Sequence, residues 1–272
     1  MKKLGIIGLG NMGSALLLGI LNSSLKNELE ISGYDIDEKK INSFKSTINI
    51  SKSAEELIRN VETLLLAIKP QDVGNFLQNY SDLINTNNSI LITIVAGLKI
   101  KIYRKYLSRV KIARVMPNTP SLVGYGASAI YFDGDFLEEE KKLIVNIFES
   151  CGIVEEVKQE DLLDVVTGLS GSGPAYVFSF INSLADGAVC EGLPRNIAIR
   201  LAIQTVLGAA FLAREKFEKE KLHLEELKDR VTSPGGTTSR GLLALEEGAF
   251  RSTVIKAVRK ATERARELGE KQ

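Results

Sequence analysis

Gly8-Leu9-Gly10-Asn11-Met12-Gly13 is the stretch that decides the fold. It follows an apolar run, Leu4 to Ile7, that predicts a short buried strand, and it opens into Ala15 to Leu21, which predicts an amphipathic helix. Between a strand and a helix, three glycines at this spacing are typical of a dinucleotide-binding turn, because they allow a tight turn and a close approach of backbone to a pyrophosphate. The free N–H groups at the helix start would then face the phosphates. The alternative is an ordinary glycine-rich turn.

An acidic residue follows the second expected strand. Leu29 to Tyr34 predicts that strand, and Asp35 stands at its end. An acid about 20 residues beyond the glycine turn meets the adenosine ribose hydroxyls and repels a 2′-phosphate, which favours NADH over NADPH. Lys39 and Lys40 could soften that preference. Alternatively, Asp35 and Asp37 serve only as turn and cap residues before the next helix.

Three further apolar runs predict central parallel strands, at Val61 to Ile68, Ser89 to Val95 and Val110 to Val115. Each ends in a short polar or small segment. Since ligands bind beyond the carboxyl ends of strands in such sheets, these segments are expected to line the dinucleotide. They comprise Ile68 to Gln71, Val95 to Gly97 and Met116 to Thr119, with the donor and acceptor of Asn118 among them.

The pattern divides the chain of 272 residues into two expected domains. Residues 1–158, with further strands at Gly126 to Phe132 and Gly152 to Val157, form an α/β Rossmann domain with a mostly parallel sheet. Residues 159–272 are expected to be all-α. Within them, Ile197 to Ala213 is apolar on nearly every face, so a second subunit is expected to cover it. The alternative is the central helix of a monomeric bundle.

Two segments of the helical part are unusually rich in glycine. Thr167 to Tyr176 holds glycines and a proline inside a helical region, which predicts a kink where backbone approaches a ligand. Thr232 to Gly241 is a glycine-rich turn that opens a helix. Its N–H groups would suit a carboxylate, and a threonine hydroxyl could bond a substrate nitrogen. The alternative for the second segment is helix capping by Thr237 or Thr238.

Composition excludes several classes. A net charge of +1 gives no basic field for nucleic acid, and two cysteines with one histidine leave no zinc site, so no metal is expected. The N-terminal apolar run is too short for a secretory signal, and no stretch is expected to reach the roughly 18 apolar residues of a membrane span. The expectation is a cytoplasmic protein with a small-molecule substrate and no membrane partner.

These motifs, in this order and along essentially the whole chain, resemble pyrroline-5-carboxylate reductase. The resemblance rests on Gly8 to Gly13, Lys69-Pro70, Val95 to Gly97, Met116 to Pro120, Leu169 to Tyr176 and Ser233 to Thr238. It implies reduction of 1-pyrroline-5-carboxylate to L-proline, the last step of proline biosynthesis, with NADPH or NADH. It also implies an N-terminal Rossmann domain and an all-α C-terminal dimerisation domain, in several members as a pentamer of dimers.

The resemblance also assigns residues. By the resemblance, cofactor contacts fall on Ile7, Gly8, Leu9, Gly10, Asn11, Met12, Ile68, Lys69, Pro70, Gln71, Val95, Ala96 and Gly97. The turn and strand-end patterns above add Gly13, Asp35 and Asn118 to the expected cofactor contacts. By the resemblance, substrate contacts fall on Glu160, Ser172, Thr237 and Thr238, and Thr238 is the expected catalytic partner of the ring nitrogen. The second glycine turn adds Ser233, Gly235 and Gly236 to the expected substrate contacts. Asp35 departs from the Ser, Asn or Arg of many members, which puts the usual NADPH preference in doubt.

Other functions compete with this one. The glycine turn also resembles the start of β-hydroxyacid dehydrogenases, but their catalytic lysine has no counterpart in Leu169 to Tyr176. A non-enzymatic nucleotide-binding regulator is disfavoured because the dinucleotide and substrate motifs occur together, and a purely structural oligomerisation protein would not need the glycine-rich turns. The source of the proton stays open, because the imine could arrive protonated or water could supply the proton through Thr238.

Overall fold

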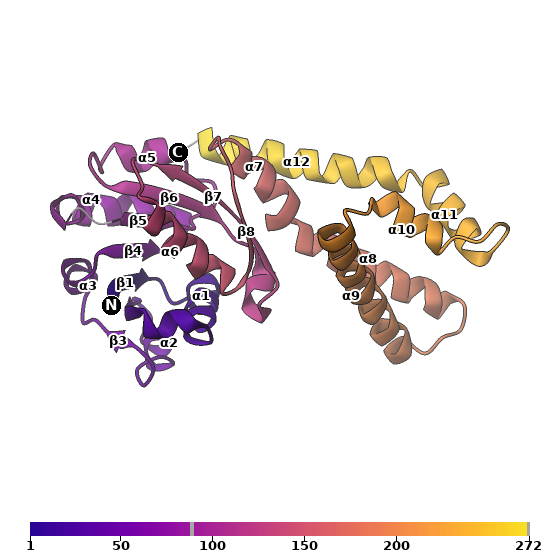
Figure 1. Ribbon diagram of the computed structural model, residues 1–272, viewed down its shortest axis with the longest axis horizontal. Helices are drawn as coiled ribbons and strands as arrows, with labels where there is room; N and C mark the ends of the chain where they lie inside the picture. Colours follow the sequence, from indigo (N-terminus) through magenta and orange to yellow (C-terminus); the bar gives the residue numbers. More distant parts are fainter. Residues whose placement is uncertain (88–89, 271–272) are drawn as a thin grey trace. The chain divides into compact units, whose positions relative to one another are not determined.

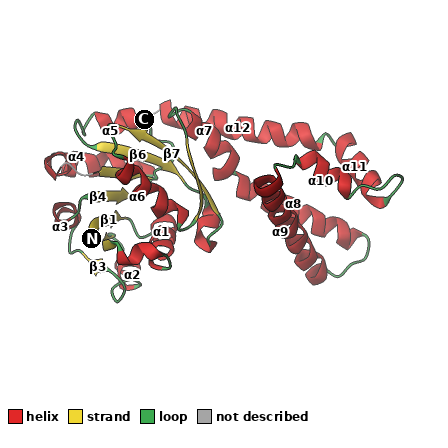
Figure 2. Cartoon of the chain, in the orientation of Figure 1, coloured by secondary structure: helices red, strands yellow, loops and turns green. Residues whose placement is uncertain are grey.

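The computed structural model describes residues 1–87 and 90–270. The chain forms two compact units, residues 1–172 with 258–272, and residues 173–257. The first unit thus extends past residue 158, where the sequence analysis placed the domain boundary, and it takes in the end of the chain. Figure 1 shows the elements of each unit in sequence colours, and Figure 2 shows that strands occur in the first unit alone among the described residues.

One eight-stranded sheet forms the centre of the first unit, in the order β3-β2-β1-β4-β5-β6-β7-β8. Strands β1 to β6 are parallel, β7 is antiparallel to β6, and β8 is parallel to β7. The mostly parallel sheet is therefore confirmed. The strands are β1 Lys2–Ile7, β2 Leu29–Tyr34, β3 Asn49–Ile50, β4 Thr63–Leu66, β5 Ile90–Thr93, β6 Lys111–Met116, β7 Gly126–Asp133 and β8 Gly152–Glu156. Ser89, the expected start of one strand, lies outside the described residues.

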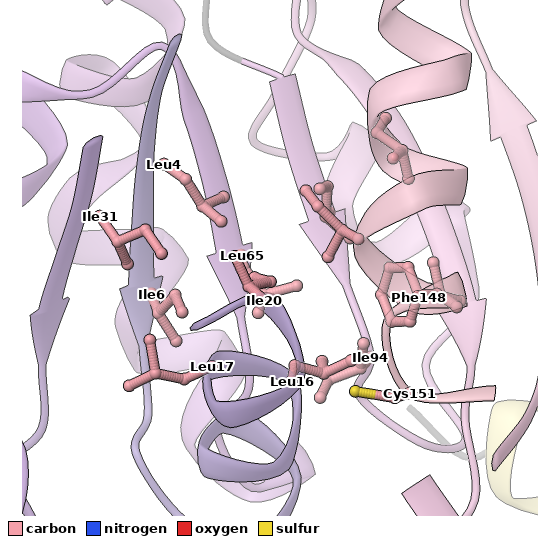
Figure 3. Close-up of a cluster of buried hydrophobic side chains, with 14 of the residues drawn as sticks. Leu4, Ile6, Leu16, Leu17, Ile20, Ile31, Leu65, Ile94, Phe148 and Cys151 are labelled. Carbon is pink, nitrogen blue, oxygen red and sulfur yellow. The ribbon is translucent and has the colours of Figure 1, made fainter. Parts of the chain in front are cut away.

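Helices cover both faces of this sheet because its strands are apolar on both faces. One buried cluster joins Leu65 of β4 to α1 and α6, as Figure 3 shows for Leu16, Leu17 and Phe148. A second cluster, on the opposite face, joins Leu64, the residue before Leu65 on β4, to α3, α4 and α5. Helical elements of this unit are α1 Asn11–Leu21, η1 Ser24–Asn27, α2 Glu38–Asn42, α3 Ala54–Asn60, α4 Pro70–Asn87, α5 Ile100–Arg104, η2 Thr119–Val123, α6 Glu138–Glu149, α7 Leu162–Val166 and the π-helix η3 Thr167–Gly171.

The second unit is all-helical, as the sequence predicts. It contains α8 Gly173–Cys190, α9 Arg195–Glu220, α10 Leu224–Arg230, α11 Thr237–Glu247 and the start of α12 Phe250–Glu270, whose end belongs to the first unit. Its one buried apolar cluster among the described residues consists of Ala185, Ala198 and Ala202. The large apolar side chains of α9 are exposed instead, Leu201 at 56% and Leu207 at 51%. This unit therefore presents its apolar surface outward.

Helix α9 corrects one expectation from the sequence. Among the described residues it is the one helix long and apolar enough to cross a membrane, with a mean hydropathy of 1.6 over its best window. Length and composition alone satisfy that test, and only 11% of the window is buried within the chain. The expected absence of such a stretch was wrong on this test, which averages hydropathy over the window and therefore tolerates Arg200 within the apolar part of α9.

The glycine-rich segment that begins at Thr167 forms a π-helix, and its glycines serve packing. A Cβ at Gly168 would overlap the Thr262 hydroxyl and lie 2.7 Å from the Val258 carbonyl oxygen, both on α12. A Cβ at Gly171 would lie 2.7 Å from the terminal methyl of Met116. Where the sequence predicts a kink beside a ligand, the structure has a π-helix, and Gly168 and Gly171 lie against neighbouring protein.

This packing yields a stability prediction. Gly168→Ala should lower the free energy of unfolding by about 1–3 kcal/mol, because the added methyl overfills the contact with α12. Gly74→Ala is the matched control, since Gly74 is exposed in α4 and its Cβ would meet nothing within 4 Å. That control should gain about 0.5–1 kcal/mol from helix propensity. Urea denaturation measures both, and equal midpoints for the two variants would contradict the packing role of Gly168.

Candidate functional site

Each glycine of the first turn meets a different requirement. Gly8 has a φ of +98°, and its Cβ would overlap the carbonyl of Ala67 on the neighbouring chain segment. A Cβ at Gly13 would overlap the carbonyl oxygen of Gly8, so helix α1 packs directly on the turn. A Cβ at Gly10 would meet nothing within 4 Å. Packing within the protein thus requires glycine at positions 8 and 13, whereas the space beside Gly10 is open.

The N-terminus of α1 offers hydrogen-bond donors. Gly10 is the N-cap without any side-chain cap, and the Ser14 N–H donates the first bond, to the Gly10 carbonyl at 2.8 Å. The N–H groups of Asn11, Met12 and Gly13 precede it, and none has an acceptor in the part of the chain that the structure describes. No acidic residue lies in this first helical turn. Such a helix end suits an anion.

The sheet brings the expected cofactor segments to one edge. Gly8 N–H donates to Tyr34, Ala67 N–H to Ile7 at 2.8 Å, and Ile94 N–H to Leu66 at 3.2 Å. The carboxyl ends of β1, β2, β4 and β5 therefore adjoin, and the turns after them adjoin too. The order β3-β2-β1-β4-β5-β6 reverses direction between β1 and β4, the place where open sheets of this kind bind dinucleotides.

Asp35, just after β2, is hydrogen-bonded to the glycine turn. Its Oδ2 accepts a hydrogen bond from the Leu9 N–H at 2.7 Å, and its Oδ1 accepts one from the Asp37 N–H at 2.9 Å. The residue is only 7% exposed. Lys40 Nζ lies 3.5 Å from Asp35 Oδ1 and 3.9 Å from Asp37 Oδ2. Asp37 caps α2 through the Lys39 N–H, so the capping alternative holds for Asp37, whereas Asp35 joins β2 to the turn.

Asn118, an expected cofactor contact, is engaged at both ends of its side chain. Its Nδ2 donates to the Ser170 carbonyl at 3.0 Å, and its Oδ1 accepts from the Ala127 N–H at 2.9 Å. The amide therefore fastens the segment after β6 to the π-helix and to β7. A contact from Asn118 to a cofactor stays a prediction.

Glu160, an expected substrate contact, is half-buried and forms an ion pair with the buried Arg114. Its Oε1 accepts from Arg114 Nη1 at 2.7 Å and from the Ile100 N–H at 2.7 Å. Arg114 is only 4% exposed, and its Nη2 lies 3.8 Å from Asp164 Oδ1. The sequence analysis missed Arg114, although a cation inside the apolar run of β6 indicates a buried partner. Glu160 thus supports the backbone after β5, and its contact with substrate stays a prediction.

More charges surround this pair. Lys99 Nζ lies 2.8 Å from Asp161 Oδ1; this hydrogen bond raises the pKa of Lys99 and lowers that of Asp161. Burial raises the pKa of the neighbouring Asp164 carboxyl. Burial also raises the pKa of Tyr103 to about 12, so its neutral hydroxyl shares a 2.7 Å hydrogen bond with Thr93. The cluster anchors the turn between β5 and α5.

The second glycine turn lies in the helical unit. Gly235 has a φ of +68°, and Gly236 is the N-cap of α11 without a side-chain cap. Capping by Thr237 or Thr238 was therefore wrong. Arg240 N–H reaches the Gly236 carbonyl at 3.4 Å, and the three preceding N–H groups, from Thr237 to Ser239, have no acceptor among the described residues. The turn thus presents donors and exposed threonine side chains.

Ser172 and Ser233 are two further expected substrate contacts. Ser172 follows the π-helix, donates its N–H to the Thr167 carbonyl at 2.8 Å and is half-buried. Ser233 is exposed, and its carbonyl accepts the Gly236 N–H at 3.1 Å, which closes the second turn. No cluster of three or more histidine, cysteine or acidic residues that could hold a metal occurs among residues 1–87 and 90–270.

Two protein-family models match the chain. The model described as pyrroline-5-carboxylate reductase dimerisation matches residues 160–268, and the one described as NADP oxidoreductase, coenzyme F420-dependent, matches residues 3–97. Pyrroline-5-carboxylate reductase of Methanosarcina acetivorans is 40% identical, and that of Synechocystis 41%, each with 99% of both chains covered.

Solved structures of reductases with the same name are also similar to this chain. The Plasmodium falciparum pyrroline carboxylate reductase with NADP bound is similar at 38% identity and a TM-score of 0.84, covering 99% of this chain and 100% of that one. The Coxiella burnetii pyrroline-5-carboxylate reductase is similar at 32% identity and a TM-score of 0.90, covering 97% of each chain.

The openness of Gly10 yields a binding prediction. Gly10→Ala should weaken binding of a reduced nicotinamide dinucleotide about tenfold or more, since a methyl would stand where backbone approaches the pyrophosphate. Its stability should change by at most about 1 kcal/mol, the cost of alanine at an N-cap. Fluorescence titration gives the affinity, with Gly74→Ala as the control. An unchanged affinity in a folded Gly10→Ala variant would contradict this site.

Proposed function

The chain belongs to the pyrroline-5-carboxylate reductase family, and we propose that its two glycine turns divide the work of that reaction. The chain is an NAD(P)H-dependent oxidoreductase that reduces 1-pyrroline-5-carboxylate to L-proline, the last step of proline biosynthesis. The first turn, Gly8 to Gly13, holds the cofactor. The second, Ser233 to Thr238, holds the substrate.

The first turn fits the diphosphate of NAD(P)H, which supplies the hydride when it is bound. Three N–H groups without acceptors, at Asn11, Met12 and Gly13, point out of the helix start, and Gly10 leaves room beside them. The positive end of the helix dipole adds to the attraction for phosphate. The turns Ile68 to Gln71 and Val95 to Gly97, on the same sheet edge, line the rest of the cofactor.

The single observation that carries the substrate site is the uncapped start of α11. The substrate is a cyclic imine that bears a carboxylate, and the N–H groups of Thr237, Thr238 and Ser239 are suited to that anion. Gly235, with its positive φ, turns the chain so that these donors face outward, and Gly236 adds no side chain beside them.

Thr238 completes the substrate site. Its hydroxyl can donate to or accept from the ring nitrogen, which must gain or hold a proton during reduction. The turn itself contains no histidine, cysteine or lysine. The imine therefore arrives protonated and Thr238 accepts its N–H, or water supplies the proton through Thr238. In either route Thr238 orients the ring for hydride attack.

The helical unit is also the surface of self-association. The family model over residues 160–268 describes dimerisation, and the exposed apolar side chains of α9 need a cover. In the proposed assembly a second copy supplies it with its own helices, and five such dimers join into a larger ring, as in several members of the family. A cytoplasmic location stays a prediction.

The role of Thr238 is open to direct test. Thr238→Ala should lower kcat/KM for 1-pyrroline-5-carboxylate about 10- to 100-fold, because a hydrogen bond to a charged group contributes about 1.5–3 kcal/mol. Thr238→Ser should restore most of the loss, since it keeps the hydroxyl. Thr232→Ala is the matched control, because the Thr232 hydroxyl already donates to the Lys228 carbonyl at 2.7 Å. Unchanged turnover and affinity in Thr238→Ala would remove the proposed role.

The interface has its own test. Leu207→Lys should shift the protein from dimer or larger to monomer or aggregate, because an unpaired cation in a buried apolar interface is strongly unfavourable. Gln78→Lys adds the same charge to an exposed position of α4 and should leave the assembly intact. Light scattering after size-exclusion chromatography reports the mass. A Leu207→Lys variant with the wild-type mass would place the interface elsewhere.

A further inference from the structure

The contacts of Asp35 at the end of β2 indicate which cofactor the site selects. We propose that Asp35 makes this enzyme prefer NADH, partly because its ion pair with Lys40 keeps that lysine from binding a 2′-phosphate. The inference rests on the proposed function of the sheet edge as an NAD(P)H site and goes beyond it, because it names the cofactor and the residues that select it.

The Asp35 carboxylate cannot turn away cheaply. Both of its oxygens accept backbone N–H groups, from Leu9 at 2.7 Å and from Asp37 at 2.9 Å, and the residue is 7% exposed. Another rotamer would leave the Leu9 N–H inside the glycine turn without an acceptor, at a cost of about 1–3 kcal/mol. The negative charge therefore stays beside the turn, where the adenosine ribose of a dinucleotide lies in sheets of this order.

The same carboxylate retains capacity for a ligand. An ionised carboxylate offers about four lone-pair sites; backbone N–H groups use two, and Lys40 Nζ lies 3.5 Å from Oδ1, on the side of a third. The second site of Oδ2 can accept a ribose hydroxyl of NADH. A 2′-phosphate has no proton to donate at neutral pH and carries up to two negative charges, so it would be repelled.

Lys40 does not offset this repulsion. Its ammonium lies between Asp35 Oδ1 at 3.5 Å and Asp37 Oδ2 at 3.9 Å, so two carboxylates share one cation. Residues 35–40 contain three acidic and two basic side chains, a formal charge of −1. A phosphate would have to take Lys40 from both carboxylates. Lys39 is the competing candidate, because its side chain is exposed and has no ion pair in the described part of the chain.

The arrangement predicts how the preference can be reversed. Asp35→Ser removes the charge, supplies a hydroxyl that a phosphate can accept from, and releases Lys40 from its nearer partner. The NADPH preference gained in this way should depend on Lys40, so Lys40→Ala should remove it in the Asp35→Ser background. In the wild-type background Lys40→Ala should leave the preference for NADH in place.

Calorimetric titration with ADP-ribose and 2′-phospho-ADP-ribose tests this without turnover. Wild type should bind ADP-ribose about tenfold or more tightly than the 2′-phosphorylated probe, which corresponds to about 1.4 kcal/mol. Asp35→Ser should reverse the ratio, and the double variant with Lys40→Ala should lose the reversal. Equal or tighter binding of the phosphorylated probe by wild type would overturn the proposal. Loss of 2′-phospho-ADP-ribose binding in the Lys39→Ala variant would also overturn it, because Lys39 would then be the residue that serves the phosphate.

Two further measurements keep the outcomes separate. If Asp35→Ser does not fold, Asp35→Asn keeps an oxygen for the Leu9 N–H and removes the charge, and its probe ratio should move in the same direction; an unchanged ratio would contradict the proposal. Reduction of 1-pyrroline-5-carboxylate with each cofactor is assayed in parallel. Turnover with a preference for NADPH refutes the role of Asp35 and leaves the reductase intact, whereas absent turnover with a retained preference for ADP-ribose refutes only the substrate assignment.

Discussion

The hydrogen bond from the Leu9 N–H to the Asp35 carboxylate is the contact on which the sheet edge depends. It joins the turn after β1 to the end of β2 at 2.7 Å, in a place from which water is nearly excluded. Gly8 and Gly13 add a steric constraint, because a side chain on either would overlap backbone of the turn or its neighbour. Together they fix the start of α1, so its unpaired N–H groups are preorganised for an anion before any ligand arrives.

A second buried charge organises the other end of the same edge. Arg114 on β6 binds Glu160, and Glu160 binds the Ile100 N–H, so one ion pair connects a central strand, the start of α5 and the segment that leads into α7. Loss of Glu160 would leave the buried Arg114, among the described residues, with only the more distant Asp164, 3.8 Å away, so the pair stabilises this end of the edge. The turn Val95 to Gly97, next to this cluster, therefore inherits its position from contacts far along the sequence.

The sequence predicted what depends on local pattern. Seven strands were recognisable as apolar runs, and β3 was missed because its two residues, Asn49 and Ile50, are too few to form a pattern. The glycine turns and their helices were equally visible. The partners of Asn118 and Glu160 were not, since Ser170 and Arg114 lie far away in the sequence. Gly168 was misread for the same reason: its neighbour is α12, which only the fold brings near.

The proposed substrate turn and the proposed surface of association lie in the same helical unit. Its buried apolar cluster among the described residues is three alanines, which cannot offset the conformational entropy of ordering some 85 residues at about 1–2 kcal/mol each. In the assembly proposed above, the exposed apolar side chains of α9 supply the missing burial against another copy. The turn before α11 lies in this same unit, so the proposal makes the folding of that turn depend on association. Stability of the substrate turn should therefore follow protein concentration by mass action.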